Sequence, residues 1–110
     1  MEAKDVRVYL HPNAEIRSYL TSNPIMKPQV EAFENPLREL PDHLAAKLGT
    51  IGAQAARELL SLSGVAKIRI KPNEVIIRKV PHVSWDDMEE EVLRIMDRAV
   101  RKSRMHVMKR

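Results

Sequence analysis

Cysteine is absent from the 110 residues of this sequence. The chain therefore has no disulfide, no thiolate nucleophile and no cysteine ligand for a metal ion or metal cluster. Glycine is scarce, with three residues, and the sequence has neither a phosphate-binding loop nor a dinucleotide-binding fingerprint. No motif brings a nucleophile together with a base. The sequence thus predicts a protein that is not an enzyme.

Long apolar runs are also missing. No run approaches the ~20 residues that a membrane-spanning helix needs, and the N-terminal residues MEAKDVRVYL carry charges where a signal peptide would have an apolar core. We therefore expect a cytoplasmic protein that does not bind membranes. Aromatic residues make up only 4% of the chain, which predicts an aliphatic core with Trp85 as its largest anchor.

The charge balance is mildly basic, with a formal net charge of +4. Such a bias attracts anionic partners but does not by itself indicate nucleic-acid binding. The length suits one small domain, which we expect over residues 1–100. Residues 101–110 contain five lysines and arginines and are predicted to form a frayed basic tail.

The first half of the chain predicts two strands, one short strand and two helices. Alternating apolar residues indicate strands at Val6–Leu10 and Ile16–Leu20. Residues 21–49 are rich in proline, and one short strand is expected there near Ala32–Phe33. A helix from Asp42 should stop at Gly49, and a second should run from Thr50 to Ser63-Gly64, where glycine suits a left-handed cap.

The second half predicts a hairpin followed by one amphipathic helix. Alternation over Val65–Ile70 and a β-branched run over Val75–Val80 flank the turn residues Pro72-Asn73. From Ser84 the period changes to 3.6 residues. The expected fold is α+β in the order ββ(α)αββα, with helices packed on one face of a small antiparallel sheet. The last helix should pack through Trp85, Met88, Val92 and Met96 against Ile68, Ile70, Val75 and Ile77.

The hairpin supplies the candidate site. If Pro72-Asn73 forms its tip, Lys67 lies opposite Arg78 and Arg69 lies opposite Ile76 on one face. Like charges directly opposite each other destabilise a sheet, so this face is a candidate for binding an acidic partner; an ordinary solvated sheet face is the alternative. The mixture of apolar and basic groups is typical of protein interfaces. The candidate partner-binding residues are Lys67, Arg69, Lys71, Ile76 and Arg78.

Metal and cofactor sites are not predicted. His11, His43, His82 and His106 are scattered, with no pair four residues apart on a helix. The acidic run from Asp86 to Glu91 complements the positive end of the predicted helix and has no glycine-bearing loop to present its carboxylates to a cation. We expect no bound metal, no cofactor and no catalytic residue.

The second half carries a resemblance to a known family. Gly64-Val65, the strand residues up to Lys79 and the helical stripe from Trp85 to Met96 resemble the N-terminal domain of NifU-like (Nfu) iron–sulfur cluster scaffold proteins. His11-Pro12-Asn13 resembles that family's first turn, and about residues 5–100 are covered. Two features differ: Ala53-Gln54-Ala55-Ala56 replaces a Ser-Pro-Leu-Ala helix start, and the cluster-holding domain with its Cys-x-x-Cys motif is missing.

The resemblance implies a non-catalytic accessory role in iron–sulfur cluster assembly or delivery. It implies protein partners, either iron–sulfur apoproteins or a cysteine-bearing scaffold. The iron-binding label of the family is not carried to any residue here. A nucleic-acid-binding protein that uses the hairpin face and the tail is the alternative, because both supply phosphate contacts, although no stacking aromatic is placed on that face. A small assembly subunit that self-associates is a further alternative.

Overall fold

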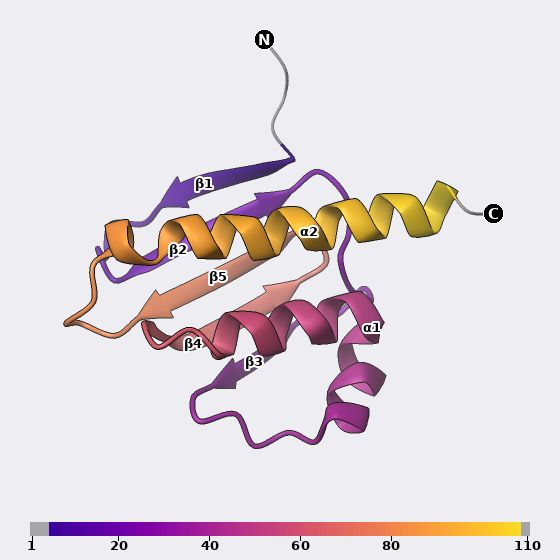
Figure 1. The fold of residues 1–110 in the computed structure, drawn as a ribbon, viewed down its shortest axis with the longest axis horizontal. Coiled ribbons are helices and arrows are strands. Elements are labelled where there is room, and N and C mark those ends of the chain that lie inside the picture. Colours follow the sequence, from indigo (N-terminus) through magenta and orange to yellow (C-terminus); the bar gives the residue numbers. More distant parts are fainter. Residues whose placement is uncertain (1–4, 109–110) are drawn as a thin grey trace, which may run out of the picture.

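The structure is a computed structural model that describes residues 5–108, with the side chains of residues 5–105. Two α-helices cover one face of a five-stranded sheet whose strand order is β1-β2-β5-β4-β3 (Figure 1). Every neighbouring pair of strands is antiparallel, so the predicted α+β architecture is confirmed. The elements are β1 (Val6–Leu10), β2 (Ile16–Thr21), β3 (Glu31–Glu34), α1 (Pro41–Leu60), β4 (Val65–Lys71), β5 (Glu74–Lys79), the 3-10 turn η1 (Trp85–Asp87) and α2 (Glu89–Met108).

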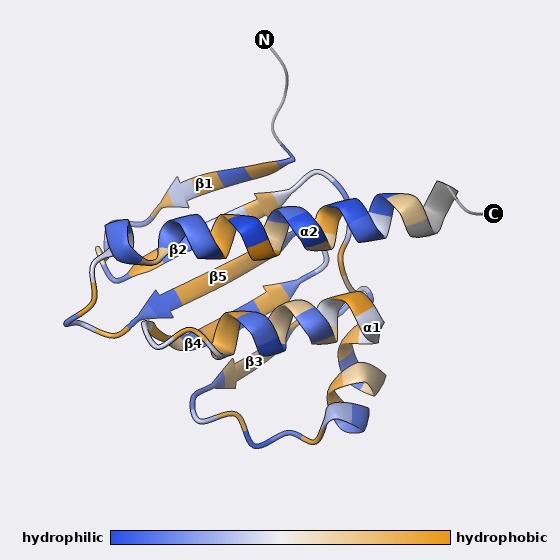
Figure 2. Ribbon diagram, in the orientation of Figure 1, coloured by the Kyte–Doolittle hydropathy of each residue, from blue (hydrophilic) through white to orange (hydrophobic). Residues whose placement is uncertain are grey.

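The core lies between the sheet and the two helices. Ile68 and Ile77 are fully buried opposite each other on the neighbouring strands β4 and β5, and Val92 and Met96 of α2 are fully buried above the sheet. Figure 2 shows the resulting alternation of hydrophilic and hydrophobic residues along α2. Trp85 is buried as predicted.

The two helices divide the sheet between them. The backbone of α1 lies next to β4 and β3, whereas that of α2 lies next to β1 and β2. The residues of the predicted packing all lie in one buried core cluster: Trp85, Met88, Val92 and Met96 with Ile68, Ile70, Val75 and Ile77. The backbone of α1 lies next to β4 because a short connection joins the two, and consecutive elements usually become neighbours in space.

The register of the β4–β5 hairpin is as predicted. Lys67 pairs with Arg78, Arg69 with Ile76 and Lys71 with Glu74, with a bulge between Val65 and Lys67. The tip is held by Thr21, the last residue of β2. Asn73 accepts a hydrogen bond from the backbone N–H of Thr21 at 2.9 Å, and its side-chain amide donates to the Thr21 carbonyl at 3.1 Å.

Glycine has different roles within α1 and after its end. Gly49 has φ 85° and ψ 168° and separates two helical segments, which confirms the predicted stop. Among residues 5–108, Gly49 is the one glycine with a positive φ. The left-handed cap predicted at Gly64 is therefore wrong. A Cβ atom on Gly64 would lie 2.6 Å from Met88 Sδ and 2.8 Å from Val83 Cγ1. Gly64 is therefore required for close packing.

The last helix begins and ends later than predicted. Ser84 accepts a hydrogen bond from the Asp86 backbone N–H at 3.1 Å, as a cap, but it begins η1, and α2 starts at Glu89. The tail predicted from residue 101 is helical as far as Met108. Ser103 is buried and its hydroxyl donates to the Pro24 carbonyl, and Arg104 pairs with Asp5. These contacts make the start of the predicted tail part of the fold.

Candidate functional site

The sheet face opposite the helices carries the candidate site, and we call it the open face (Figure 1). Its members follow from strand alternation and from the pairing of neighbouring strands. Fully buried Tyr19, Val75 and Ile68 point toward the helices, so the residues on either side of each point toward the open face. The open face comprises Arg7, Tyr9, Ile16, Ser18, Leu20, Ala32, Glu34, Lys67, Arg69, Lys71, Glu74, Ile76 and Arg78.

A shallow hollow of about 280 Å³ lies in the open face. The structure places four of the five predicted residues around it, and Lys71 lies farther along β4, 3.6 Å from Glu74 in an ion pair. Isoleucine forms the apolar part of the lining, and lysine and arginine form the basic part. The lining residues are His11, Ile16, Lys67, Arg69, Ile76 and Arg78.

The arginines of the open face differ from those of α2 in their pairing. On α2, Arg94, Arg98, Arg101 and Arg104 each form a salt bridge. The open face instead holds arginines and a lysine that form no salt bridge with any side chain of residues 5–105, although Glu34 lies across from Lys67 in the strand register. Positive charge on this face is thus not balanced by ion pairs among the described side chains. The cations without a salt bridge on this face are Arg7, Lys67, Arg69 and Arg78.

Residues from the first two strands complete the open face, and the sequence interpretation missed them. His11 Nε2 and Ser18 Oγ are hydrogen bonded at 2.7 Å, and the Tyr9 ring meets the His11 ring edge-on with centroids 5.1 Å apart. The interpretation that no aromatic lies on this face is corrected by Tyr9. Alternation within Val6–Leu10 gives the two sides of that strand, but the pairing of β2 with β5 has no local signal in the sequence.

The polar groups at the start of α2 form an internal brace. Glu89 Oε1 accepts hydrogen bonds from Arg17 at 2.6 Å and from the Tyr19 hydroxyl at 2.8 Å. The Arg17 guanidinium also lies 4.8 Å from the centre of the Trp85 ring. Burial, followed by the hydrogen bond and negative charge of Glu89, raises the pKa of Tyr19 far above its ordinary value of 10. These groups satisfy one another and link β2 to the helix.

The histidines do not converge on one site. His11 lies at the hollow of the open face, whereas His82 follows β5 and lies with Arg17 and Trp85 in a separate hollow. Within the described part of the chain, no group of three His, Asp or Glu side chains is placed to hold a metal ion. The side chain of His106 lies outside the described residues.

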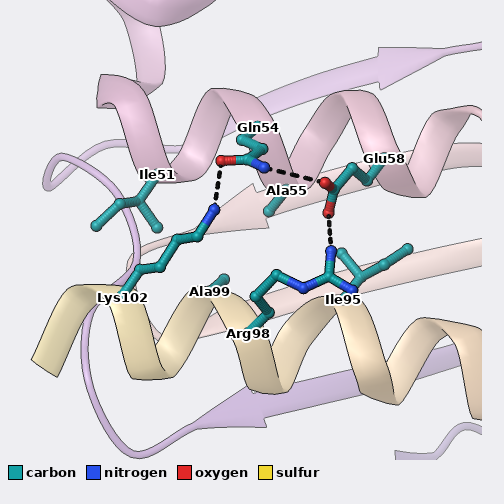
Figure 3. Close-up of a pocket in the computed structure, with 8 residues that line it drawn as sticks. All are labelled: Ile51, Gln54, Ala55, Glu58, Ile95, Arg98, Ala99 and Lys102. Carbon is teal, nitrogen blue, oxygen red and sulfur yellow. Dashed lines mark hydrogen bonds and ion pairs between the residues drawn. The ribbon is translucent and has the colours of Figure 1, made fainter. Parts of the chain in front are cut away.

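The seam between α1 and α2 leaves no room for a ligand. Lys102 Nζ donates to Gln54 Oε1 at 2.7 Å, Gln54 Nε2 donates to Glu58 Oε2 at 3.1 Å, and Arg98 Nη1 donates to Glu58 Oε1 at 3.2 Å (Figure 3). The enclosed space is about 10 Å³, close to the minimum for one water molecule. This polar ladder joins the helices and is not a binding site.

Comparison with known proteins identifies the family. The family described as "Scaffold protein Nfu/NifU N terminal" matches residues 6–103. The chain belongs to this family. The resemblance seen in the sequence is therefore confirmed, and the Nfu N-terminal domain is related to iron–sulfur cluster scaffolding.

Two solved structures share the fold of this Nfu N-terminal domain. A NifU-like protein from Saccharomyces cerevisiae, solved by NMR, matches with a TM-score of 0.63 and 15% identity, covering 89% of this chain and 82% of the other. Protein SAV1430 from Staphylococcus aureus, a crystal structure, matches with a TM-score of 0.60 and 12% identity, covering 84% and 98%. No curated protein matches the chain significantly. Among the described helices, none is long and apolar enough to cross a membrane.

Proposed function

We propose that this Nfu N-terminal domain is a non-catalytic docking module in iron–sulfur cluster assembly or delivery, and that its open face binds a protein partner. The observation that carries the proposal is the set of cations without salt bridges around the hollow at Ile76. Family membership supports the connection to iron–sulfur proteins. The charge pattern of this chain supports the open face as the contact surface.

The partner is expected to hold the cluster. Iron–sulfur clusters are generally bound by cysteine thiolates, and this chain has no cysteine. The partner is therefore an iron–sulfur apoprotein or a cysteine-bearing scaffold, and the cluster is its cargo. In this role the domain contributes recognition, while the chemistry of cluster transfer takes place on the partner.

The hollow and the cations have different tasks in this proposal. Ile16 and Ile76 offer apolar surface whose burial contributes about 25 cal/mol per Å² before the costs of association. Arg69 and Arg78 set the orientation and speed of encounter with an acidic surface, a contribution that salt screens. Binding is therefore expected to weaken, but not to vanish, between low and physiological ionic strength.

A charge-reversed variant with a matched control tests the proposal. R69E/R78E reverses two exposed arginines on the open face, and R38E/R57E reverses two exposed arginines elsewhere that also form no salt bridge among residues 5–105. Both variants change the net charge equally. The immobilised proteins would be exposed to native lysate and the captured proteins quantified by mass spectrometry. We expect iron–sulfur proteins or their assembly factors on wild type and on R38E/R57E, with roughly tenfold less on R69E/R78E.

Two outcomes would contradict the proposal. Equal capture by R69E/R78E and wild type would show that the open face is not the contact surface. Recovery of RNA alone, lost at high salt, would favour the alternative of a nucleic-acid-binding protein. Tyr9 gives that alternative one aromatic side chain on the open face, so the same captures should also be analysed for nucleic acid.

A further inference from the structure

The outer edge of β1 is a second unusual surface. Within the described residues, β1 has a partner strand on one side only, and its sequence VRVYL contains a single charge. Val8 is 37% exposed, Tyr9 54% and Leu10 60%. The opposite edge strand, β3, begins and ends with glutamate, which is a usual protection against edge-to-edge pairing. The β1 edge lacks such protection.

The direction of the backbone groups on this edge follows from the pairing with β2. The Ser22 N–H donates to the Asp5 carbonyl at 2.9 Å, so Asp5 and, by alternation, Arg7 and Tyr9 turn their N–H and C=O groups toward β2. Val6, Val8 and Leu10 must then turn theirs outward. The edge therefore presents three donors and three acceptors that no described strand uses.

We propose that this edge pairs with β1 of a second copy of the chain, antiparallel and centred on Val8. In that register Val8 faces Val8 of the second copy, and Val6 faces Leu10. Every outward N–H and C=O on the strand then has a partner, because hydrogen-bonded pairs recur at every second residue. The exposed apolar side chains of one copy meet those of the other, which removes them from water.

The same register avoids like charges. Arg7 of each copy faces Tyr9 of the other, which permits a cation–π contact and places no arginine opposite another. The two-fold axis of such a pair is perpendicular to the sheet, so both open faces lie on the same side. The dimer would present two copies of the basic hollow on one continuous sheet. This inference does not rest on the proposed function, because the edge is a different surface from the hollow.

Proline at the central position tests the pairing directly. Because the Val8 N–H points away from β2, V8P removes an outward donor and leaves the β1–β2 hydrogen bonds intact, as proline on an edge strand can. V8T keeps the N–H and the β-branched shape and is the matched control. In sedimentation equilibrium, the apparent mass of wild type and of V8T should rise with concentration from 12.7 kDa toward twice that mass. The apparent mass of V8P should stay that of the monomer. A thermal melt checks that V8P is folded; if it is not, V8K carries the test, since two lysines would then face each other.

Single cysteines test the register, because the chain has none of its own. At a hydrogen-bonded antiparallel pair the Cα atoms are about 5.5 Å apart, within the range of a disulfide, so V8C should form a covalent dimer under mild oxidation. L10C is the control. In the proposed dimer the cysteines at position 10 of the two copies would be about 13 Å apart along the strand, so L10C should crosslink at least tenfold more slowly than V8C. Three results would each overturn the proposal. They are a wild type that stays monomeric at millimolar concentration, a dimer that persists in V8P and V8K, and equal crosslinking of V8C and L10C.

Discussion

At the scale of single residues, Tyr19 shows how burial and charge act on one side chain. Its hydroxyl donates to Glu89, which also accepts from Arg17. Burial is the larger cause that raises the pKa of Tyr19, and Glu89 adds to it. The folded protein therefore keeps this proton at pH values at which the unfolded chain loses it. The residue joins the sheet to α2 and makes stability depend on pH.

Replacement of Tyr19 by phenylalanine should show this linkage. Because the folded-state pKa is raised, the contribution to stability is fully present below pH 10 and is lost as pH rises above about 10. Y19F should lower the unfolding free energy by about 1 kcal/mol near pH 7, because one hydrogen bond is lost. Between pH 10 and 11.5 the unfolding free energy of Y19F should fall less steeply with pH than that of wild type. Urea unfolding across this range measures both effects. Y9F, at an exposed position, is the control, and parallel profiles for Y19F and wild type would refute the linkage.

At the scale of elements, the sequence pattern predicted the features that neighbouring residues in the chain determine. The β4–β5 register followed from alternation and from the turn residues Pro72-Asn73, and the stop at Gly49 followed from glycine's freedom at positive φ. The role of Gly64 did not follow, because it depends on Val83 and Met88 reaching it through the fold. Likewise, five of the thirteen residues of the open face come from β1 and β2, and the pairing of β2 with β5 is long-range and has no local signal in the sequence.

The junction of α1, β4 and η1 gives a prediction at this scale. In G64A the new methyl group would overlap Met88 Sδ and Val83 Cγ1, and the valine, being stiff, cannot move aside as easily as the methionine. We expect a loss of about 1–3 kcal/mol of stability, typical of overpacking. The same substitution in an M88A background should cost less, because one of the two obstacles is removed. Chemical denaturation of the four proteins measures the coupling, and equal costs in both backgrounds would contradict the packing role.

At the scale of the whole molecule, the two sides of the sheet use their charges differently. The helical side pairs its arginines within α2, with Glu58 of α1 and with Asp5, which immediately precedes β1. The open face leaves Arg69 and Arg78 to the solvent, although it places Lys67 directly opposite Arg78. Such repulsion lowers the stability of the isolated domain slightly. A partner with negative charge would relieve it, which joins the fold to the proposed docking role.

The end of α2 is tied to the rest of the fold by two contacts beyond residue 100. Ser103 bonds to the Pro24 carbonyl and Arg104 pairs with Asp5, so this turn of the helix fastens both the start of β1 and the segment after β2. Removal of residues 101–110 should therefore cost about 2 kcal/mol, most of it from the buried hydroxyl and the shortened helix, since the partly exposed ion pair contributes less than about 1 kcal/mol. Removal of residues 106–110 keeps both contacts and should change stability by less than about 0.5 kcal/mol. Thermal and urea unfolding of the two truncated proteins measure these losses of stability. Equal, small losses would contradict the prediction and would favour a frayed tail from residue 101.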